Sequence, residues 1–200
     1  MRRATAWAAL ATAALLAFGC DKLFTPAAGP FHGVDVTGSP AMGTDFRLKD
    51  PDGKERTLAD FRGKVVAIFF GYTQCPDFCP TTLADFANAM QILGADAQRV
   101  QVILITVDPK RDTPELLKQY VPAFNPTFLG LYGDAAATAK VTKDFKIYVN
   151  ERPGSAPNRY LVDHSSQTLV FDPQGRLRLM IPYGAPAAKI ASDLKILLNS

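Results

Sequence analysis

Cysteine and histidine are scarce in this chain of 200 residues, and the scarcity restricts the chemistry it can perform. The chain contains three cysteines, Cys20, Cys75 and Cys79, and two histidines, His32 and His164. Three cysteines cannot build a disulfide scaffold, so each of them needs its own explanation. Any site made of thiolates and imidazoles therefore has few possible members.

The chain also lacks a strong excess of charge, and it lacks the several long apolar runs of a multi-span membrane protein. Its formal net charge is +3, from 22 basic and 19 acidic residues, and two of the basic residues are Arg2 and Arg3 at the start. A nearly neutral body gives no electrostatic reason to bind nucleic acid, so we exclude that class of partner. With 48% hydrophobic and 20% charged residues, the composition is that of one ordinary globular domain.

Residues 1–19 have the features of a secretory signal. Two arginines precede an apolar stretch, residues 4–18, that is shorter than the roughly 20 residues of a spanning helix. The stretch ends with Gly19 before Cys20, which resembles a bacterial lipobox. We therefore expect a lipoprotein-type signal peptide over residues 1–19 and a lipidated Cys20; an ordinary signal peptide or an uncleaved anchor are the alternatives. Each alternative places the body outside the cytoplasm, and Asp21 is typical of lipoproteins retained on the periplasmic side of the Gram-negative inner membrane.

Residues 20–40 are rich in proline and glycine and show little periodicity. This composition predicts a tether that joins the membrane surface to a folded domain over residues 41–200. We expect the end of the tether to pair at most loosely with the domain. His32 lies in this segment, where an exposed histidine is expected to be solvated and to have no role.

Residues 41–200 alternate between strand patterns and helix patterns. Continuous runs of β-branched and aromatic residues predict strands buried on both faces at 65–70 and 100–107. A turn sequence at 172–175 predicts a hairpin near the end of the chain, and another at 51–53 predicts an N-terminal hairpin. Helical spacing with start and stop signals predicts the helices, and short apolar runs predict the remaining strands. The expected helices are 81–93, 114–121, 134–145 and 187–198, and the remaining strands are 128–132, 168–171 and 176–181.

This order of elements predicts one α/β domain with a mixed central sheet flanked by helices. The alternation of buried strands and helices, followed by an antiparallel hairpin, is that of a thioredoxin-like fold. Residues 146–160 do not belong to this order. Their prolines and glycine predict that they form an inserted loop or ribbon.

Two of the three cysteines lie between a predicted strand and a predicted helix, in the sequence CPDFCP at residues 75–80. Ligands and reactive groups collect at the carboxyl ends of strands in such sheets, and a helix N-terminus lowers the pKa of a nearby thiol. Pro80 fits the first helical position, which would make Cys79 the capping residue. The spacing lets both sulfurs converge as a disulfide or as two metal ligands. A purely structural disulfide is the alternative, but so short a loop removes little entropy from the unfolded chain.

His164 is the third candidate for this site. It stands just before the predicted strand 168–171, and in a thioredoxin-like topology the loop before that strand faces the cysteine turn. A lone histidine is usually an ordinary core or surface residue, but two thiols expected nearby favour a ligand. Two thiolates and one imidazole form a soft site that suits Cu(I) and can also take Cu(II) or Zn(II). A structural zinc site would need a fourth protein ligand, and no further cysteine or histidine is placed to supply it.

These motifs together resemble the signature of the Sco/SenC family. In chain order they are FHG at 31–33, DFRGK at 60–64, GYTQCPDFCPT at 71–81, DPKRDTP at 108–114 and DHS at 163–165. The resemblance implies a thioredoxin-like fold with copper, as Cu(I) or Cu(II), bound by Cys75, Cys79 and His164. It also implies a role in building the dinuclear copper centre of cytochrome c oxidase. We expect Asp77 to tune the thiol pKa or cap the helix, and Asp163 to orient the imidazole.

Two functions follow from this set of residues. In the first, the chain is a copper metallochaperone that delivers one copper ion to the copper-receiving subunit of cytochrome c oxidase. In the second, it is a thiol-disulfide oxidoreductase whose redox pair, Cys75 and Cys79, reduces the cysteines of that subunit, so whether the chain is an enzyme stays open. His164 favours copper, because thiol exchange needs only two cysteines. The other expected partners are the membrane surface, through the lipid anchor, and another periplasmic copper chaperone or a thioredoxin-like reductant.

Two further features carry alternatives. Thr73 two residues before Cys75 resembles peroxiredoxins, but position 69 is phenylalanine where that family has proline, so a peroxidase is the weakest interpretation. The segment 108–115 is either a capped loop or a surface for a partner. Thr113 and Pro114 are explained well enough as the start of a helix.

Overall fold

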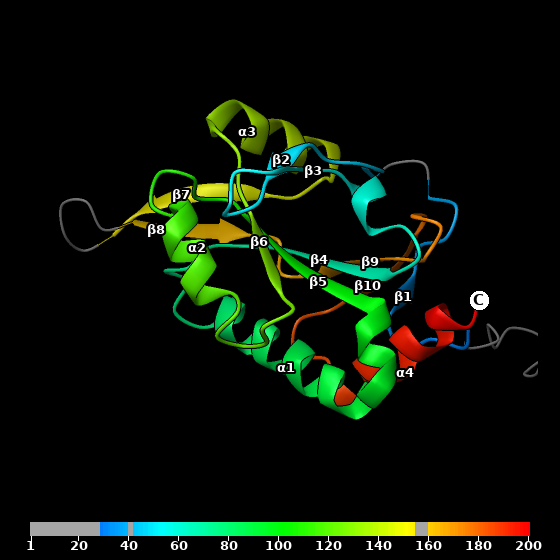
Figure 1. Ribbon diagram of the computed structural model, residues 1–200. Helices are drawn as coiled ribbons and strands as arrows, with labels where there is room; N and C mark the ends of the chain where they lie inside the picture. Colours follow the sequence, from blue (N-terminus) through cyan, green and yellow to red (C-terminus); the bar gives the residue numbers. More distant parts are fainter. Residues whose placement is uncertain (1–28, 40–41, 155–159) are drawn as a thin grey trace, which may run out of the picture.

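The computed structural model describes residues 29–39, 42–154 and 160–200 (Figure 1). The expected signal peptide at 1–19, the lipidation residue Cys20 and most of the expected tether lie outside these ranges. Within them, no helix combines the length and the apolar character that crossing a membrane requires.

A mixed six-stranded sheet forms the centre of the described structure, with the strand order β1-β10-β9-β4-β5-β6. Strands β4, β5 and β6 are parallel, whereas β1, β10 and β9 are each antiparallel to the strand that follows them in that order. The bounds are β1 Val34–Asp35, β4 Val65–Gly71, β5 Val100–Thr106, β6 Leu129–Leu131, β9 Thr168–Phe171 and β10 Leu177–Ile181. The expected mixed sheet is therefore confirmed.

The two central strands fix where a functional site can form. Every residue of β4 is buried, as its continuous apolar run predicts. β4 and β5 pair in register from Val65 opposite Val100 to Gly71 opposite Thr106. Both strands therefore end at the same edge of the sheet, and the loops that follow them lie side by side at that edge.

Helices cover both faces of the sheet (Figure 1). α1 and α4 pack against each other on one face, α3 covers the opposite face, and α2 lies against the edge strand β6. Thr113 and Asp134 are the N-caps of α2 and α3, because their side chains accept hydrogen bonds from the amides of Leu116 and Ala137. The helices are α1 Phe78–Leu93, α2 Pro114–Tyr120, α3 Ala135–Asp144 and α4 Ala187–Leu198, with short 3-10 helices at Leu58–Phe61 and Gly94–Arg99.

Helix α1 begins earlier than the sequence predicts. Its N-cap is Asp77, and Cys79 lies inside the first turn instead of capping it. Pro80 is the third helical residue, a position where its missing N–H leaves no hydrogen bond unmade, because the first amides of a helix have no partner within it. The expectation that Pro80 starts the helix was therefore wrong.

The folded unit also begins earlier than residue 41. β1 pairs with β10, and the buried carboxylate of Asp193 accepts the backbone N–H groups of His32 at 2.8 Å and Gly33 at 2.7 Å. The predicted tether is thus too long at its C-terminal end. The local composition gave no sign that Asp193, far along the chain, accepts the N–H groups of His32 and Gly33. The residue His32 is exposed.

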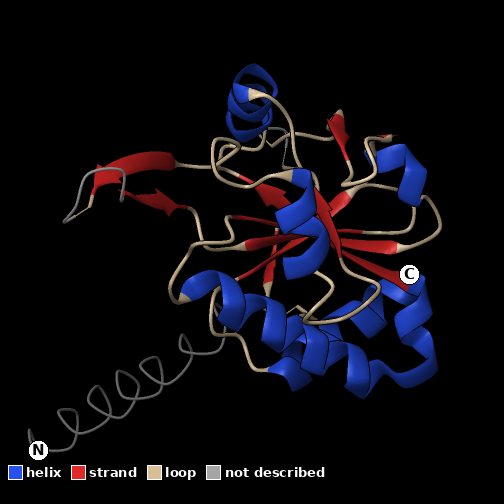
Figure 2. Ribbon diagram, turned by 60° about the vertical axis from the view of Figure 1, so that its left-hand side comes forward, coloured by secondary structure: helices blue, strands red, loops and turns tan. Residues whose placement is uncertain are grey.

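A ribbon of two antiparallel strands, β7 Val149–Pro153 and β8 Tyr160–His164, begins in the expected insertion at 146–160, extends beyond it to residue 164 and projects from the main sheet (Figure 2). Residues 155–159 between the strands lie outside the described ranges. The sequence predicts that His164 lies in a loop, but it is the last residue of β8. The predicted N-terminal hairpin is confirmed as β2 Leu48–Lys49 and β3 Glu55–Arg56.

Candidate metal centre

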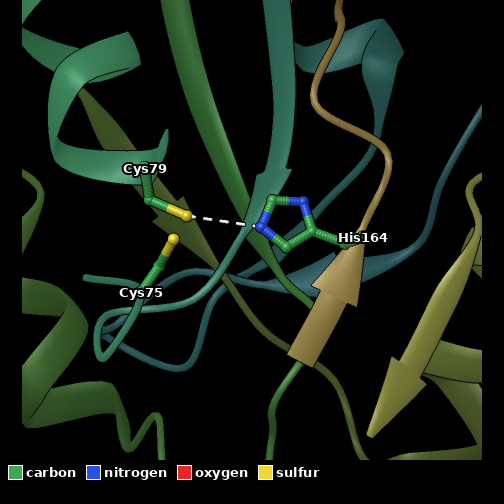
Figure 3. Close-up of side chains that lie close together, drawn as sticks. All are labelled: Cys75, Cys79 and His164. Carbon is green, nitrogen blue, oxygen red and sulfur yellow. Dashed lines mark hydrogen bonds between the residues drawn. The ribbon is translucent and has the colours of Figure 1, made fainter. Parts of the chain in front are cut away.

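Three side chains from distant parts of the chain converge at the carboxyl edge of the central strands (Figure 3). Cys75 lies in the turn after β4, Cys79 in the first turn of α1, and His164 at the end of β8. Their possible ligand atoms all lie within 4.8 Å of one another, and Cys79 Sγ is 3.5 Å from His164 Nε2. The structure thus brings together the three residues that the sequence singles out.

Gly71, the last residue of β4, makes room for the inner sulfur. A Cβ at this position would lie 2.8 Å from Cys79 Sγ and 2.7 Å from a ring carbon of Phe69. Cys79 is fully buried in this space, whereas Cys75 is 6% exposed. Only the packing seen in the structure explains why a residue with a Cβ atom does not fit at position 71.

The imidazole of His164 is held in one tautomer. Its Nδ1 lies 2.9 Å from the backbone carbonyl oxygen of Ser165, which can only accept, so Nδ1 carries the proton and donates it. Nε2 then presents a lone pair to the sulfurs, as a metal ligand requires. The rings of Phe69 and Tyr72 stand edge-on to the imidazole, each with centroids 5.9 Å apart, and restrict its rotation.

Asp163 does not orient the imidazole, contrary to expectation. Its carboxylate pairs with Arg152 Nε at 2.6 Å, across the ribbon. Successive side chains of a strand point to opposite faces, so Asp163 faces away from the side to which His164 points. The carbonyl group of Ser165 performs the expected role.

Asp77 acts through its backbone. It occupies the N-cap position of α1, but its side chain makes no capping hydrogen bond. Its backbone N–H is one of the groups that lower the pKa of Cys75. Asp77 thus stands at the expected capping position without a side-chain capping bond, and its influence on the thiol comes from the amide.

The two thiols have very different proton affinities. A hydrogen bond from the Cys79 thiol lowers the pKa of Cys75 to about 4, although burial opposes this shift. The pKa of Cys79 is raised, because its thiol donates to the Cys75 sulfur and is itself buried. At neutral pH the reduced pair therefore holds one thiolate and one thiol.

A pocket of about 150 Å³ opens onto this site. Cys75 and His164 line it, while Cys79 lies behind them. Phe78, 46% exposed, and Leu161, 41% exposed, also line it. The outer thiolate and the imidazole are thus accessible from solvent on one side, beside exposed apolar side chains.

Two sulfurs and one imidazole nitrogen form a soft donor set. Among the residues that the structure describes, no further cysteine, histidine or carboxylate joins this group. A closed structural zinc site normally has four protein ligands, whereas Cu(I) accepts two thiolates and an imidazole. The donor set therefore fits copper better than structural zinc.

Sequence reasoning assigned no role to Tyr72, Arg111 or Tyr160, which lie in and beside the site. Arg111 contacts both the cysteine turn and the ribbon, through Gln74 and Tyr160. The only available signal was that Arg111 belongs to the DPKRDTP motif. A motif names residues but not their contacts, so the partners of Arg111 could be found only in the structure.

The fold and the site together define a class of protein, a thioredoxin-like domain with a CxxxC turn at the start of a helix and a distant histidine that completes a metal-ligating group. Comparison with known families narrows this class. The profile of the SCO1/SenC family matches residues 34–199, and the chain belongs to that family.

Individual relatives agree with this membership. The chain is 40% identical over 136 residues to the SCO2-like protein RP587 of Rickettsia prowazekii, covering 68% of this chain and 66% of that protein. It is 39% identical over 133 residues to the human mitochondrial SCO2 homolog, covering 66% of this chain and 50% of that protein. The matched region thus spans between half and about two thirds of the length of these relatives.

Solved structures of relatives have the same fold. ScoI of Bradyrhizobium japonicum, described with copper bound, is 38% identical, with a TM-score of 0.73 and coverage of 78% of this chain and 99% of that one. Yeast Sco1, also described with copper bound, is 31% identical, with a TM-score of 0.73 and coverage of 80% and 90%.

Proposed function

We propose that this chain binds one copper ion through Cys75, Cys79 and His164 and delivers it to the dinuclear copper centre of cytochrome c oxidase. The observation that carries the proposal is the convergence of two sulfurs and an imidazole nitrogen within 4.8 Å. The copper-bound structures of the Bradyrhizobium and yeast relatives support it.

The three ligands would have different parts in loading and release. Cys75 is already a thiolate at neutral pH, whereas Cys79 has to lose a proton when copper binds. Cys75 and His164 line the pocket. Thiolates of the receiving subunit would therefore approach from this side and replace the outer ligands first.

The reduced full chain, titrated anaerobically with Cu(I), should bind one copper per chain. Cys75→Ser and Cys79→Ser should each abolish tight binding, and His164→Ala should weaken it at least tenfold, about 1.4 kcal/mol. His32→Ala, which removes an exposed imidazole, is the matched control and should bind normally. Thiolate-to-copper absorption reports the binding. Two or more coppers at saturation, with neither cysteine variant impaired, would contradict the proposal.

A second candidate function is supported by the unequal pair of thiols. The Cys75 thiolate could attack a disulfide of the receiving subunit, forming a mixed disulfide and releasing one of that subunit's sulfurs as thiolate. Cys79 would then lose its proton and attack the Cys75 sulfur, which forms the Cys75–Cys79 disulfide and releases the second sulfur of the subunit. This reaction does not use His164. Normal oxidase assembly by His164→Ala at low copper, with failure of both cysteine variants, would therefore favour the reductase.

We also propose that the domain works on the periplasmic side of the inner membrane, anchored through a lipidated Cys20. A relative from Bacillus anthracis that is named a SCO1/SenC family lipoprotein supports this proposal; it is 25% identical, with a TM-score of 0.68 and coverage of 82% of this chain and 96% of that one. In this location another periplasmic copper chaperone would supply copper, and a thioredoxin-like reductant would keep the cysteines reduced.

A further inference from the structure

We propose that Arg111 is the positioning residue of the metal site, holding the ribbon that carries His164 against the turn that carries Cys75. The proposal rests on the copper binding proposed above. It assigns a role to a residue that touches none of the three ligands directly and that lies in the loop between β5 and α2.

The ribbon needs an external anchor. β7 and β8 form a two-stranded sheet of their own, separate from the six-stranded sheet. An isolated two-stranded hairpin is only marginally stable in water, so contacts with the rest of the domain must fix its position. His164 ends β8, and its distance from the cysteines therefore depends on those contacts.

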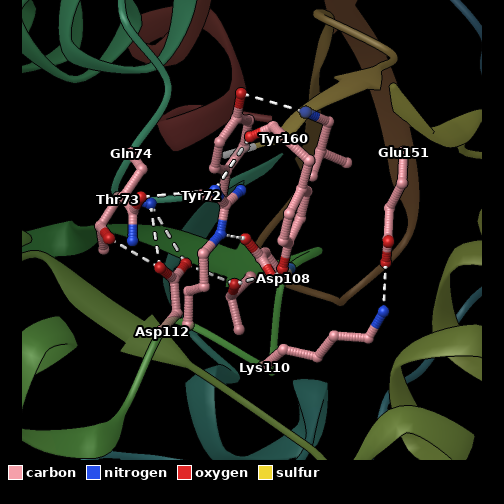
Figure 4. A network of polar contacts seen from close by, with 11 residues as sticks. Tyr72, Thr73, Gln74, Asp108, Lys110, Asp112, Glu151 and Tyr160 are labelled. Atoms are coloured by element: carbon pink, nitrogen blue, oxygen red, sulfur yellow. Dashed lines mark hydrogen bonds and ion pairs between the residues drawn. The ribbon is translucent and has the colours of Figure 1, made fainter. Parts of the chain in front are cut away.

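Arg111 holds the first residue of β8 in several ways. Its guanidinium carbon lies 3.6 Å from the centre of the Tyr160 ring, and its Nη1 donates to the Tyr160 carbonyl oxygen at 2.9 Å. Its Nε pairs with the buried carboxylate of Asp108, which also accepts the Tyr160 hydroxyl at 2.7 Å (Figure 4). Ring, carbonyl and hydroxyl of one ribbon residue are thus bound by one loop.

The same guanidinium reaches the cysteine turn. Nη1 lies 3.3 Å from the side-chain oxygen of Gln74, the residue before Cys75, and the guanidinium is 5.5 Å from the centre of the Tyr72 ring. The Tyr72 hydroxyl in turn accepts the N–H of Val162 in the middle of β8, at 3.2 Å. Arg111 therefore stands between the two parts of the chain that must meet for a complete site.

The neighbouring contacts hold the cysteine turn and the ribbon separately. Asp112 accepts hydrogen bonds from Thr73 at 2.6 Å and from Thr106 at 2.6 Å, which holds the cysteine turn to the end of β5 without the ribbon. Lys110 pairs with Glu151 on β7 at 2.7 Å, but both side chains are at least half exposed, so this pair adds little. Removing Arg111 should therefore release the ribbon and leave the cysteines in place.

Arginine suits this position better than lysine. Its planar fork can stack on an aromatic ring while it donates in several directions, whereas an ammonium group acts as a compact point charge. Replacing Arg111 alone would leave the Asp108 carboxylate buried without its cation, which destabilises a protein for reasons unrelated to the site. The main test therefore removes both charges.

The test compares three variants of the full chain with the wild type. Arg111→Gln combined with Asp108→Asn removes the ion pair, Arg111→Lys keeps the charge, and Tyr160→Leu removes the stacked ring but leaves the ion pair. Arg47→Gln, which breaks an exposed pair with Glu55, is the matched control. Three measurements are made: Cu(I) affinity, imidazole nitrogen coupling in the electron paramagnetic resonance spectrum of the Cu(II) form, and amide hydrogen exchange over 160–164.

We expect the double variant to bind Cu(I) at least tenfold more weakly, to lose the nitrogen coupling, and to exchange the amides of β8 at least tenfold faster. Exchange in β4 and α1 should not change. Tyr160→Leu should shift all three measurements in the same direction, Arg111→Lys should not restore them, and Arg47→Gln should match the wild type.

Two outcomes would overturn the inference. One is wild-type affinity with intact nitrogen coupling in the double variant and in Tyr160→Leu. The other is unchanged exchange in β8, which would show that Arg111 does not hold the ribbon. If the wild type itself bound no copper, the proposed function would fail, while the exchange measurement would still decide whether Arg111 anchors β8.

Discussion

Cys75 and Cys79 are four residues apart, yet their surroundings make them chemically unequal. Cys75 faces the pocket, and its pKa is lowered to about 4, chiefly by the hydrogen bond from Cys79. Cys79 lies beneath Gly71, fully buried, and its pKa is raised. A turn followed by the first turn of a helix produces this difference, because it places one sulfur at the surface and the other beneath the end of a strand.

This difference predicts selective alkylation by iodoacetamide. In the reduced Cys20→Ser chain, Cys75 should react and Cys79 should not, because only a thiolate attacks and only Cys75 is both ionised and accessible. The pKa of Cys75 lies below its ordinary value, so the rate should be nearly constant from about pH 8 to pH 5 and fall below about pH 4. Peptide mass spectrometry after timed quenching measures both sites.

The matched control for this experiment is Cys79→Ala. It removes the thiol that donates to Cys75, so the pH at which alkylation slows should move upward by at least one unit. Equal modification of both cysteines in the Cys20→Ser chain, or a rate that already falls between pH 8 and pH 7, would contradict the interpretation.

At this scale the sequence predicted which residues meet, but not all of the contacts that support them. The spacing of Cys75 and Cys79, the scarcity of histidine and the expected topology selected the three residues whose side chains meet. The role expected of Asp163 was wrong because residues 160–164 form a strand, and the alternation of a strand sends neighbouring side chains to opposite faces. Asp163 and His164 were expected in the loop before the strand 168–171, so the direction of each side chain could not be read from the sequence.

At the scale of elements, the buried parts of the fold were the most predictable. β4 and β5 are long apolar runs that burial on both faces requires, and their predicted bounds differ from the observed ones by one residue. β1 has two residues, both exposed; it pairs with β10, and the two residues before it donate to a carboxylate about 160 positions away. No local pattern reveals such a partner, so the start of the folded unit could not be predicted.

Asp193 is that partner, and replacing it with asparagine should loosen β1. Its two carboxylate oxygens each accept one backbone N–H, from His32 and Gly33. Asparagine has only one side-chain oxygen, and its NH₂ group cannot accept, so one of the two hydrogen bonds is lost. We expect Asp193→Asn to reduce the free energy of unfolding by about 1 kcal/mol, because one partly buried N–H group loses its acceptor. Amide exchange over 32–36 should become faster, as hydrogen-exchange mass spectrometry can measure.

The comparison for Asp193→Asn is Asp96→Asn, at a more exposed carboxylate whose nearest cations are 3.9 Å away. This variant should change neither stability nor exchange measurably. Copper affinity should remain normal in both, because three strand pairings separate β1 from β4, at whose end the site lies. Unchanged exchange over 32–36 in Asp193→Asn would show that another contact holds β1.

At the scale of the whole molecule, the small net charge conceals several buried carboxylates that hold turns together. Asp50 in the N-terminal hairpin pairs with Arg56, Asp108 beside the site pairs with Arg111, and Asp172 pairs with Arg176. Each carboxylate is at least 96% buried while its partner remains partly exposed. The pKa values of Asp50 and Asp172 are lowered overall, so the stability of the domain should depend on pH through these two acids and not through the net charge.

Asp172 gives the clearest test of this dependence. Burial acts to raise its pKa, but hydrogen bonds from the backbone and side chain of Arg176, together with Arg178, lower it overall. A carboxyl whose pKa is lower in the folded state adds stability above its unfolded pKa, about 3.9, and loses that contribution as the pH falls through the folded pKa. Asp172→Asn should therefore be less stable than the wild type by about 2 kcal/mol at pH 7, and this difference should shrink below about pH 4.

Urea unfolding at pH 7, 5 and 3.5 measures the difference between Asp172→Asn and the wild type. Asp52→Asn is the appropriate control, because Asp52 pairs with Lys118 at 2.6 Å but is 71% exposed, so its effect should be small at every pH. The amide of the Asp172→Asn variant keeps the size of the carboxyl and can still accept from the turn backbone, so packing alone predicts a difference that does not change with pH. A difference in the free energy of unfolding that stays constant from pH 7 to pH 3.5 would therefore show that packing causes the effect. A difference that shrinks as the pH falls would show that the charge of Asp172, paired with Arg176 and Arg178, causes it.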